Sequence, residues 1–270
     1  MKVKEENIKD VVRSKYNQIA TQSKQENESS CCGSTGCCDT IDYAVFADDY
    51  TSLDGYSKDA DLGLGCGLPT EFANIKKGDS VLDLGSGAGN DCFVARSIVG
   101  EEGRVIGLDF APAMLRKAKE NALKLGYDNV EFVKGDIEDM PIESESIDVI
   151  VSNCVLNLVP DKQKAFSQMY RVLKNGGHFS ISDVVLVGDL PVSLVKDAEM
   201  YAGCVSGAIQ KQNYLDIIKE AGFTNIDVQK EKTINIPDEI LTNYMTENEL
   251  SDFREGSTGI YSITVSAVKE

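Results

Sequence analysis

Cysteines are the residues of this chain best suited to bind a soft ion. They occur at positions 31, 32, 37, 38, 66, 92, 154 and 204. Cys154 follows an asparagine in "SNCVLNLVP", at the end of an apolar run, whereas Cys66 in "LGLGCGLP" and Cys204 in "YAGCVSGA" have small neighbours. Thiolates are soft ligands, so these three residues could form a site for a thiophilic ion. The alternative for Cys154 is core packing, because a cysteine often behaves as a small buried hydrophobe.

A glycine-rich segment, "LDLGSGAGND", lies between an apolar run and a helical pattern. Its glycines, Gly85, Gly87 and Gly89, allow the backbone to turn tightly and to approach a ligand closely. The G-x-G-x-G spacing differs from the G-x-G-x-x-G of dinucleotide-binding enzymes, and no Lys-Ser or Lys-Thr pair follows it, which excludes a P-loop. A structural turn would explain these glycines equally well, so the neighbouring residues must decide.

Carboxylates stand in or directly after three of the apolar runs. Asp83 precedes the glycines, Asp109 follows Gly89 by 20 residues in "VIGLDF", and Asp136 stands in "VKGDIEDMP". An acid at the distance of Asp109 can accept hydrogen bonds from both hydroxyls of a ribose. Three carboxylates would repel a pyrophosphate and tolerate a cationic sulfonium. The combination resembles the class I S-adenosylmethionine-dependent methyltransferases, and a nicotinamide-dependent oxidoreductase is the alternative.

The elements that position these residues are predicted by short apolar runs that alternate with helical patterns from residue 79 onward. This alternation predicts a parallel sheet covered by helices on both faces. We expect an α/β, Rossmann-like class I methyltransferase fold with a mostly parallel seven-stranded sheet, plus a smaller C-terminal or inserted lobe. The expected strands are "SVLDL", "VIGLDF", "VEFVKGD", "IDVIVSNCVL", "HFSISDVVL", "NIDVQKEKTI" and "IYSITVSAVK".

The charge and composition restrict the partners of this chain. Its 270 residues carry a formal net charge of −17, which argues against nucleic acid and against an anionic membrane surface. The start "MKVKEENIKD" has no apolar run of a secretory signal, and the most apolar segments are too short and too polar to span a bilayer. Eight cysteines are too few for a disulfide scaffold in a chain of this length. We therefore expect a cytoplasmic protein, and a monomer.

At its cysteines the sequence resembles the arsenite S-adenosylmethionine methyltransferases. The resemblance runs from about Tyr50 to Phe223, and "SNCVLNL" and "YAGCVSGA" are its most specific segments. It implies that Cys66, Cys154 and Cys204 are the As(III) ligands. Trivalent arsenic is a soft thiophile, and in a pyramidal trithiolate it keeps a lone pair that can attack a methyl group. No general base is needed, so the single histidine, His178, is expected to be structural. Cys92, which follows the glycine-rich segment, is expected to belong to the core.

The resemblance also implies a cofactor site for S-adenosylmethionine. The residues expected around the methionine part are Asp83, Gly85, Ser86, Gly87, Gly89 and Asn153. Asp109 would hold the ribose, and Phe110 and Met114 would pack on the adenine. The edge of the adenine would be flanked by Asp136, Ile137 and Glu138, and Tyr50 would close over the cofactor.

Three parts of the chain are expected from this reading. Residues 1–40 would form an amphipathic helix, over residues 3–20, and a flexible cysteine-rich loop. Residues 41–187 would form the S-adenosylmethionine-binding domain. Residues 188–270 would form an arsenic-binding lobe and the last strands of the sheet. Within this last part, residues 235–259 have a helical, acidic pattern without a functional explanation.

The N-terminal segment "CCGSTGCC" is open to several interpretations. Its adjacent pairs lack the C-x₂-C spacing of common zinc sites. The resemblance implies a further cysteine that exchanges disulfides with Cys66, for which Cys38 is the first choice and Cys37 the second. Methylation formally oxidises arsenic to As(V), so thioredoxin or glutathione would return the electrons through these thiols. Alternatively, the segment captures As(III) and passes it inward, or it is a dispensable tail.

Two other functions remain open from the sequence. The first is a methyltransferase of the same fold that acts on carbon, with a quinone-type or sterol-type acceptor, in which the three cysteines would be dispensable. The second is a protein that sequesters arsenic or zinc without turnover. The intact glycine-rich segment speaks against this second alternative.

Replacing the four N-terminal cysteines (31, 32, 37 and 38) together by serine should slow methylation over many turnovers more than in the first turnover. The reason is that the spent enzyme would lack thiols for exchange with thioredoxin or glutathione. Product formed per enzyme, followed with each reductant, measures this effect. An unchanged multi-turnover rate would mean that the segment is dispensable.

Overall fold

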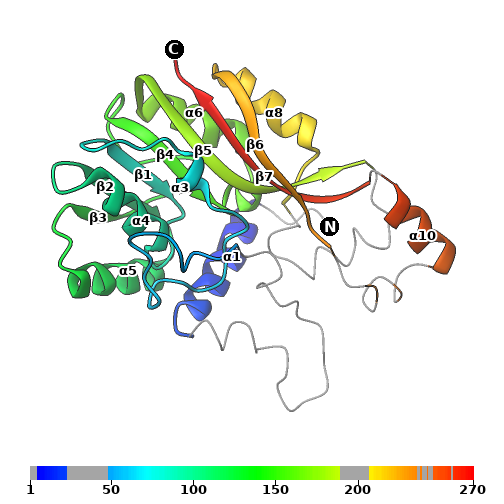
Figure 1. The fold of residues 1–270 in the computed structure, drawn as a ribbon, viewed down its shortest axis with the longest axis horizontal. Coiled ribbons are helices and arrows are strands. Elements are labelled where there is room, and N and C mark those ends of the chain that lie inside the picture. The colour runs from blue at the N-terminus through cyan, green and yellow to red at the C-terminus, as the bar shows by residue number, and fades with distance from the viewer. Residues whose placement is uncertain are drawn as a thin grey trace.

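The fold is built on one twisted sheet (Figure 1). The computed structural model describes residues 5–22, 48–188, 207–235, 238, 242, 246–256 and 258–270. Within these residues the sheet has seven strands in the order β3-β2-β1-β4-β5-β7-β6. The strands are β1 (Ser80–Leu84), β2 (Arg104–Asp109), β3 (Val130–Lys134), β4 (Ile147–Asn153), β5 (Leu173–Val187), β6 (Thr224–Thr233) and β7 (Gly259–Val268). Strands β1 to β5 are parallel and β7 is antiparallel to β5 and β6, which confirms the expected mostly parallel sheet.

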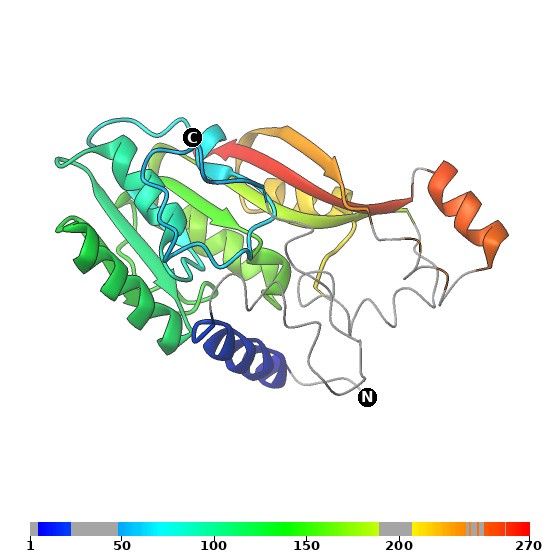
Figure 2. The same cartoon turned by 60° about the horizontal axis from the view of Figure 1, so that its bottom comes forward.

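Helices cover both faces of this sheet, whereas α10 (Glu247–Glu255) lies beyond the sheet, where β7 begins (Figures 1 and 2). The helical elements are α1 (Glu5–Ile19), α3 (Pro69–Phe72), α4 (Asn90–Val99), α5 (Pro112–Leu125), the 3-10 helix η2 (Leu156–Leu158), α6 (Lys162–Val172), α8 (Lys211–Glu220) and α10. The expected helix over residues 3–20 corresponds to α1, and α10 is the described helical part of residues 235–259.

Two large hydrophobic cores lie between the helices and the two faces of the sheet. One packs α4, α5 and the end of α1 against strand side chains such as Val81 and Val149. The other packs α6, α8 and η2 against side chains such as Leu82 and Ile150. Neighbouring strand residues enter different cores because successive side chains of a strand point to opposite faces. Both faces are therefore apolar, which explains why the parallel strands appear in the sequence as continuous apolar runs.

The carboxyl ends of β1, β2, β3 and β4 meet at one edge of the sheet, because these strands are parallel neighbours. The glycine-rich turn follows β1, Asp109 ends β2, Asp136 follows β3 and Asn153 ends β4. Figure 2 shows α1 beside α5 at this end of the molecule. The sheet therefore brings together residues that are far apart in the sequence.

The last strands, β6 and β7, complete the same sheet. The division of the chain at residues 40 and 187 stays a prediction. None of the helices in the described part of the chain combines the length and apolar character that a bilayer-crossing segment needs.

Leu173→Ala should destabilise the protein by about 2–5 kcal/mol, because it removes a wholly buried side chain from the core beneath α6 and α8. Leu123→Ala is the matched control, since the Leu123 side chain is 83% exposed. Urea unfolding followed by circular dichroism compares the two variants. Equal losses of stability would contradict the assignment of Leu173 to the core.

Candidate functional site

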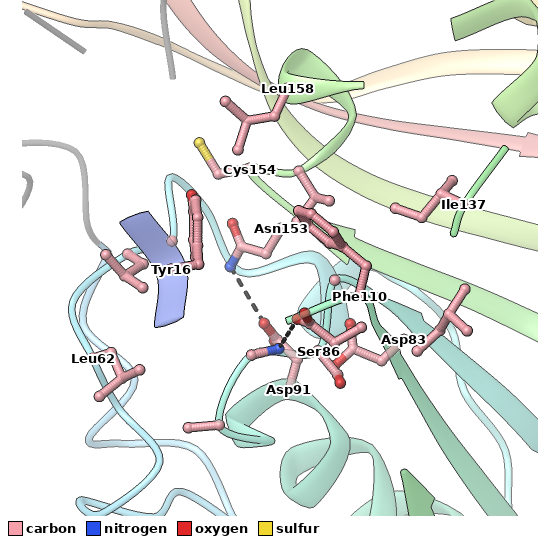
Figure 3. Close-up of a pocket in the computed structure, with 18 of the residues that line it drawn as sticks. Tyr16, Leu62, Asp83, Ser86, Asp91, Phe110, Ile137, Asn153, Cys154 and Leu158 are labelled. Carbon is pink, nitrogen blue, oxygen red and sulfur yellow. Dashed lines mark hydrogen bonds between the residues drawn. The ribbon is translucent and has the colours of Figure 1, made fainter. Parts of the chain in front are cut away.

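A cavity opens at the carboxyl edge of the parallel strands (Figure 3). Its empty volume is about 1190 Å³, which includes the part open to solvent. Ligands of open α/β sheets bind at this edge. The predicted site residues that line the cavity are Tyr50, Asp83, Gly85, Ser86, Gly87, Asp109, Phe110, Asp136, Ile137, Asn153 and Cys154.

Three predicted cofactor residues do not line the cavity. A Cβ at Gly89 would lie 2.8 Å from a Phe93 ring carbon, so this glycine allows α4 to pack closely. Met114 is wholly buried in the core under α5. Glu138 accepts hydrogen bonds from the Lys9 ammonium at 2.7 Å and from a backbone N–H at 3.1 Å. The structure does not bring these three residues to the pocket, and their contact with a cofactor stays a prediction.

The glycine-rich turn is held against β2 by backbone hydrogen bonds. The Gly85 N–H donates to the Leu108 carbonyl at 2.8 Å, and the Gly87 N–H donates to Asp109 Oδ2 at 2.9 Å. Gly85 has a φ of 69°, and a Cβ there would lie 2.5 Å from the Val155 side chain. Gly87 has a φ of 52°, but a Cβ there would meet no protein atom within 4 Å. At Gly87, therefore, a side chain would enter the cavity itself.

Asp109 is a buried carboxylate that faces this cavity. Its Oδ1 accepts a hydrogen bond from the Ala111 N–H at 2.8 Å and its Oδ2 accepts the bond from Gly87. Burial raises the pKa of Asp109, although these backbone donors act in the opposite direction. Each oxygen retains a lone pair, so the carboxylate can accept further hydrogen bonds from a ligand.

Asp83 and Asp91 form a pair of carboxylates in the same cavity. Burial, and then the charge of Asp91, raises the pKa of Asp83 well above its usual range. Burial raises the pKa of Asp91 to about 6. Cys92 Sγ donates to Asp83 Oδ2 at 3.2 Å, and the Tyr50 hydroxyl lies 2.9 Å from both oxygens of Asp91. The expected core position of Cys92 is confirmed, and its thiol also holds Asp83.

Sequence reasoning missed Asp91. An acid in the first turn of a helix is favourable for the helix dipole, so its type and position give no sign of a ligand site. In the structure Asp91 lines the cavity, because α4 begins directly after the glycine-rich turn and Asp91 is in its first turn.

The Asn153 amide ties the segment around Cys66 to the end of β4. Its Oδ1 accepts a hydrogen bond from the Cys66 N–H at 3.0 Å. Its Nδ2 donates to the Gly67 carbonyl at 2.7 Å and to the Tyr50 hydroxyl. A Cβ at Gly65 would lie 2.6 Å from Asn153 Nδ2. The glycines around Cys66 thus permit a close backbone approach; a direct contact of Asn153 with a methionine amino group stays a prediction.

Cys66 and Cys154 are buried thiols on the two sides of this connection. The Cys154 N–H donates to the Ser182 carbonyl at 2.8 Å, and the residue has a left-handed φ of 59°. The Cys66 carbonyl accepts a hydrogen bond from the Ser262 hydroxyl at 2.6 Å. The Cys154 backbone is therefore fixed at the end of β4 against the middle of β5, and the Cys66 backbone is fixed against β7.

Both thiols lie close enough to Tyr214 to affect its ionisation. Burial, then the charge and hydrogen bond of Asp183, raises the pKa of Tyr214 well above its usual range, and Cys66 and Cys154 add to this shift. The Tyr214 hydroxyl donates to Asp183 Oδ2 at 3.0 Å. Both thiols therefore lie in the electrostatic neighbourhood of Tyr214 on α8.

The remaining predicted ligands lie outside the described residues. These are Cys204 and the N-terminal cysteines, Cys38 among them. Among the residues that the structure does describe, no three His, Cys, Asp or Glu side chains group closely enough to hold a metal ion. His178 Nε2 lies 2.6 Å from the Ala73 carbonyl and does not line the cavity, in agreement with a structural role.

Helix α1 supplies one wall of the cavity, which sequence reasoning did not predict. Lys9, Val12 and Tyr16 line it, and Figure 3 shows the Tyr16 side chain pointing from α1 into the pocket. The amphipathic pattern of α1 predicts a packed helix but does not indicate where the helix packs.

Comparison with known sequences supports a methyltransferase fold and site. Residues 75–222 match a family model described as a methyltransferase domain. The arsenite methyltransferase of Halobacterium salinarum is 39% identical over 269 residues, which cover 94% of this chain and 66% of that protein. A ubiquinone/menaquinone biosynthesis C-methyltransferase of Klebsiella pneumoniae is 30% identical over 181 residues, which cover 58% of this chain and 71% of that protein.

A solved structure supports the same assignment. The arsenic(III) S-adenosylmethionine methyltransferase of Chlamydomonas reinhardtii matches with a TM-score of 0.63 and 35% identity, over 76% of this chain and 67% of that chain. The fold, the glycine-rich turn and these similarities confirm the resemblance seen in the sequence. The chain belongs to the S-adenosylmethionine-dependent methyltransferases with the class I fold and, within them, to the arsenite methyltransferase family.

Proposed function

We propose that this chain transfers methyl groups from S-adenosylmethionine to arsenite bound by cysteine thiols. The observation that carries the proposal is the position of Cys154, a buried thiol that lines the cavity at the end of β4. The Cys66 N–H donates a hydrogen bond to the neighbouring residue, Asn153. A soft substrate requires soft ligands beside the methyl donor. Cys154 would supply one at the cavity, and Cys66 would supply a second from the segment bound to Asn153.

The cavity has chemistry that suits S-adenosylmethionine. The Ser86 hydroxyl is buried and, within the described residues, has no hydrogen-bond partner, so it is available to a ligand. The open position beside Gly87 leaves room for that ligand. Two carboxylates, Asp83 and Asp91, match the positive charges of an ammonium and a sulfonium. When bound, S-adenosylmethionine supplies an electrophilic methyl group.

Roles follow from the position of each residue. We propose that Asp83 and Asp91 bind the methionine ammonium and that Ser86 and Gly87 contact the methionine backbone. Asp109 would accept hydrogen bonds from the ribose hydroxyls. Phe110 and Ile137 would pack on the faces of the adenine, and Asp136 would bind its edge. Tyr50 closes the segment before β1 over Asp91 and Asn153. Each of these residues acts by binding or orienting, and none has to transfer a proton.

Arsenite binding would use Cys66, Cys154 and, in the segment after β5, Cys204. Each As–OH group of arsenous acid would exchange for one As–S bond, and each thiol proton would leave in a water molecule. The bound arsenic keeps its lone pair, which is the nucleophile. Mono- and dimethylated arsenicals would be the products. A thiol reductant such as thioredoxin or glutathione would return the electrons that methylation removes from arsenic.

A carbon-acceptor methyltransferase is the second candidate. The similarity to a quinone C-methyltransferase favours it, because such an enzyme would use the same fold and the same cofactor site. This candidate has no use for the Cys154 thiol at the cavity or for the Cys66 thiol in the segment bound to Asn153. The consequences of cysteine substitution therefore distinguish the two functions.

Cys154→Ser and Cys66→Ser should each abolish methylation of arsenite, because a hydroxyl is a hard ligand and the trithiolate cannot form. Cys92→Ser is the matched control: this buried thiol belongs to the core, so the variant should bind arsenite with the wild-type stoichiometry. Binding to the reduced protein and methylated arsenic are measured in the same samples. Full methylation of arsenite by Cys154→Ser would contradict the role of this thiol as an arsenic ligand, and a wild-type protein that neither binds nor methylates arsenite would favour the carbon-acceptor function.

The affinity for S-adenosylmethionine should rise between about pH 5 and pH 7, because Asp91, whose pKa is about 6, becomes anionic in that range. Asp91→Asn should flatten this dependence and weaken binding roughly tenfold at neutral pH, the effect expected for losing a charged hydrogen-bond acceptor. The same change removes the Asp91 charge that raises the pKa of Asp83. Isothermal titration calorimetry at several pH values tests this, and an unchanged pH profile in Asp91→Asn would contradict the role of Asp91.

A further inference from the structure

Lys9 of helix α1 bridges two carboxylates in the loop after β3. Its Nζ lies 2.6 Å from Asp136 Oδ2 and 2.7 Å from Glu138 Oε2. Burial lowers the pKa of Lys9, but the hydrogen bonds and charges of Asp136 and Glu138 outweigh this effect and the net shift is upward. The ammonium therefore stays charged, and it joins residues 127 positions apart in the chain.

The Asp136 carboxylate is oriented from both sides. Its Oδ2 accepts the hydrogen bond from Lys9, and its Oδ1 accepts one from the Glu138 N–H at 3.0 Å. The side chain is still 44% exposed and lines the cavity, so lone pairs remain for a ligand. Without Lys9, this carboxylate would be fixed on one side only.

Helices α1 and α5 are also joined by side-chain hydrogen bonds, in which each helix binds backbone groups at one end of the other. The first turn of α5 has no side-chain cap of its own, and Asn17 Oδ1 accepts a hydrogen bond from the Ala113 N–H at 3.0 Å. The last turn of α1 contains no basic residue, and the Lys117 ammonium of α5 donates to the Ala20 and Gln22 carbonyls at 3.3 and 3.1 Å. Helix ends need such partners for their unpaired backbone groups. These contacts hold the wall formed by Lys9, Val12 and Tyr16 over the cavity.

We propose that α1 closes the adenine end of the cofactor site and that Lys9 is a positioning residue, which holds the Asp136 carboxylate for the adenine edge. This inference rests on the proposed function, because it assigns the cavity to S-adenosylmethionine. It adds a determinant of cofactor affinity from a helix that precedes the methyltransferase domain in the sequence and lies outside the residues matched by the family model.

Lys9→Met should raise the KM for S-adenosylmethionine about fivefold, the effect expected from losing a partly exposed ion pair, while kcat and the KM for arsenite stay unchanged. Lys9→Arg should restore the wild-type KM, because a guanidinium can bridge both carboxylates. Lys174→Met is the matched control: it breaks a similar ion pair, Lys174 Nζ to Asp148 at 2.8 Å, which does not line the cavity.

Three further measurements separate a positioning role from a structural one. Binding of S-adenosylmethionine by calorimetry should weaken in Lys9→Met and not in Lys174→Met, with equal thermal midpoints. The difference between Lys9→Met and the wild type should shrink as salt is added, because exposed ion pairs are screened. Amide hydrogen exchange over residues 5–19 of the wild type should slow when S-adenosylmethionine is added.

The outcomes distinguish the two proposals. If wild-type protein does not bind S-adenosylmethionine, the proposed function fails and this inference fails with it. If wild-type protein binds it but Lys9→Met has the affinity of Lys174→Met, or exchange in α1 does not respond, the inference alone is overturned. If Lys9→Met has a lower thermal midpoint, the more conservative Lys9→Gln replaces it in the same comparison.

Discussion

The hydrogen bonds of the Asn153 side chain are the constraint on which the site depends. One amide group joins the end of β4 to the Cys66 N–H, the Gly67 carbonyl and the Tyr50 hydroxyl. This brings the segment before the first strand over the carboxyl edge of the sheet, next to Cys154. Because the backbones approach so closely, Gly65 and Gly67 cannot carry a side chain without displacing Asn153 or Ser182. The arrangement of the two thiols thus follows from an amide and two glycines rather than from the cysteines themselves.

The second feature of the site is its buried negative charge. A buried carboxylate without a cationic partner is costly in free energy, and the raised pKa values of Asp83 and Asp91 express that cost. A cationic ligand removes the cost by pairing with these groups. The same residues would repel a pyrophosphate. Charge, together with the shape of the glycine-rich turn, therefore selects a sulfonium cofactor over a dinucleotide.

The sequence predicted what depends on local pattern and on strand order. Apolar runs located the strands, and the position of Asp109 and Asp136 at strand ends indicated the cavity, because parallel strands end at the same edge. Contacts between distant segments could not be predicted in this way. Asp91 has the pattern of an ordinary helix start, and Met114, expected to pack on the adenine, lies in the core. The amphipathic pattern of α1 does not specify that Lys9 reaches Asp136. Cys204 and the N-terminal cysteines lie outside the described residues, so their roles rest on the sequence alone.

The proposed function requires the arsenic substrate to be held by sulfur alone beside the methyl donor. X-ray absorption at the arsenic edge, on reduced protein loaded with one equivalent of arsenite, tests it most directly. We expect three sulfur neighbours and no oxygen neighbour in the wild type, and the loss of one sulfur neighbour in Cys154→Ser. Oxygen neighbours in the wild type, or a spectrum that Cys154→Ser leaves unchanged, would contradict a trithiolate site that includes Cys154.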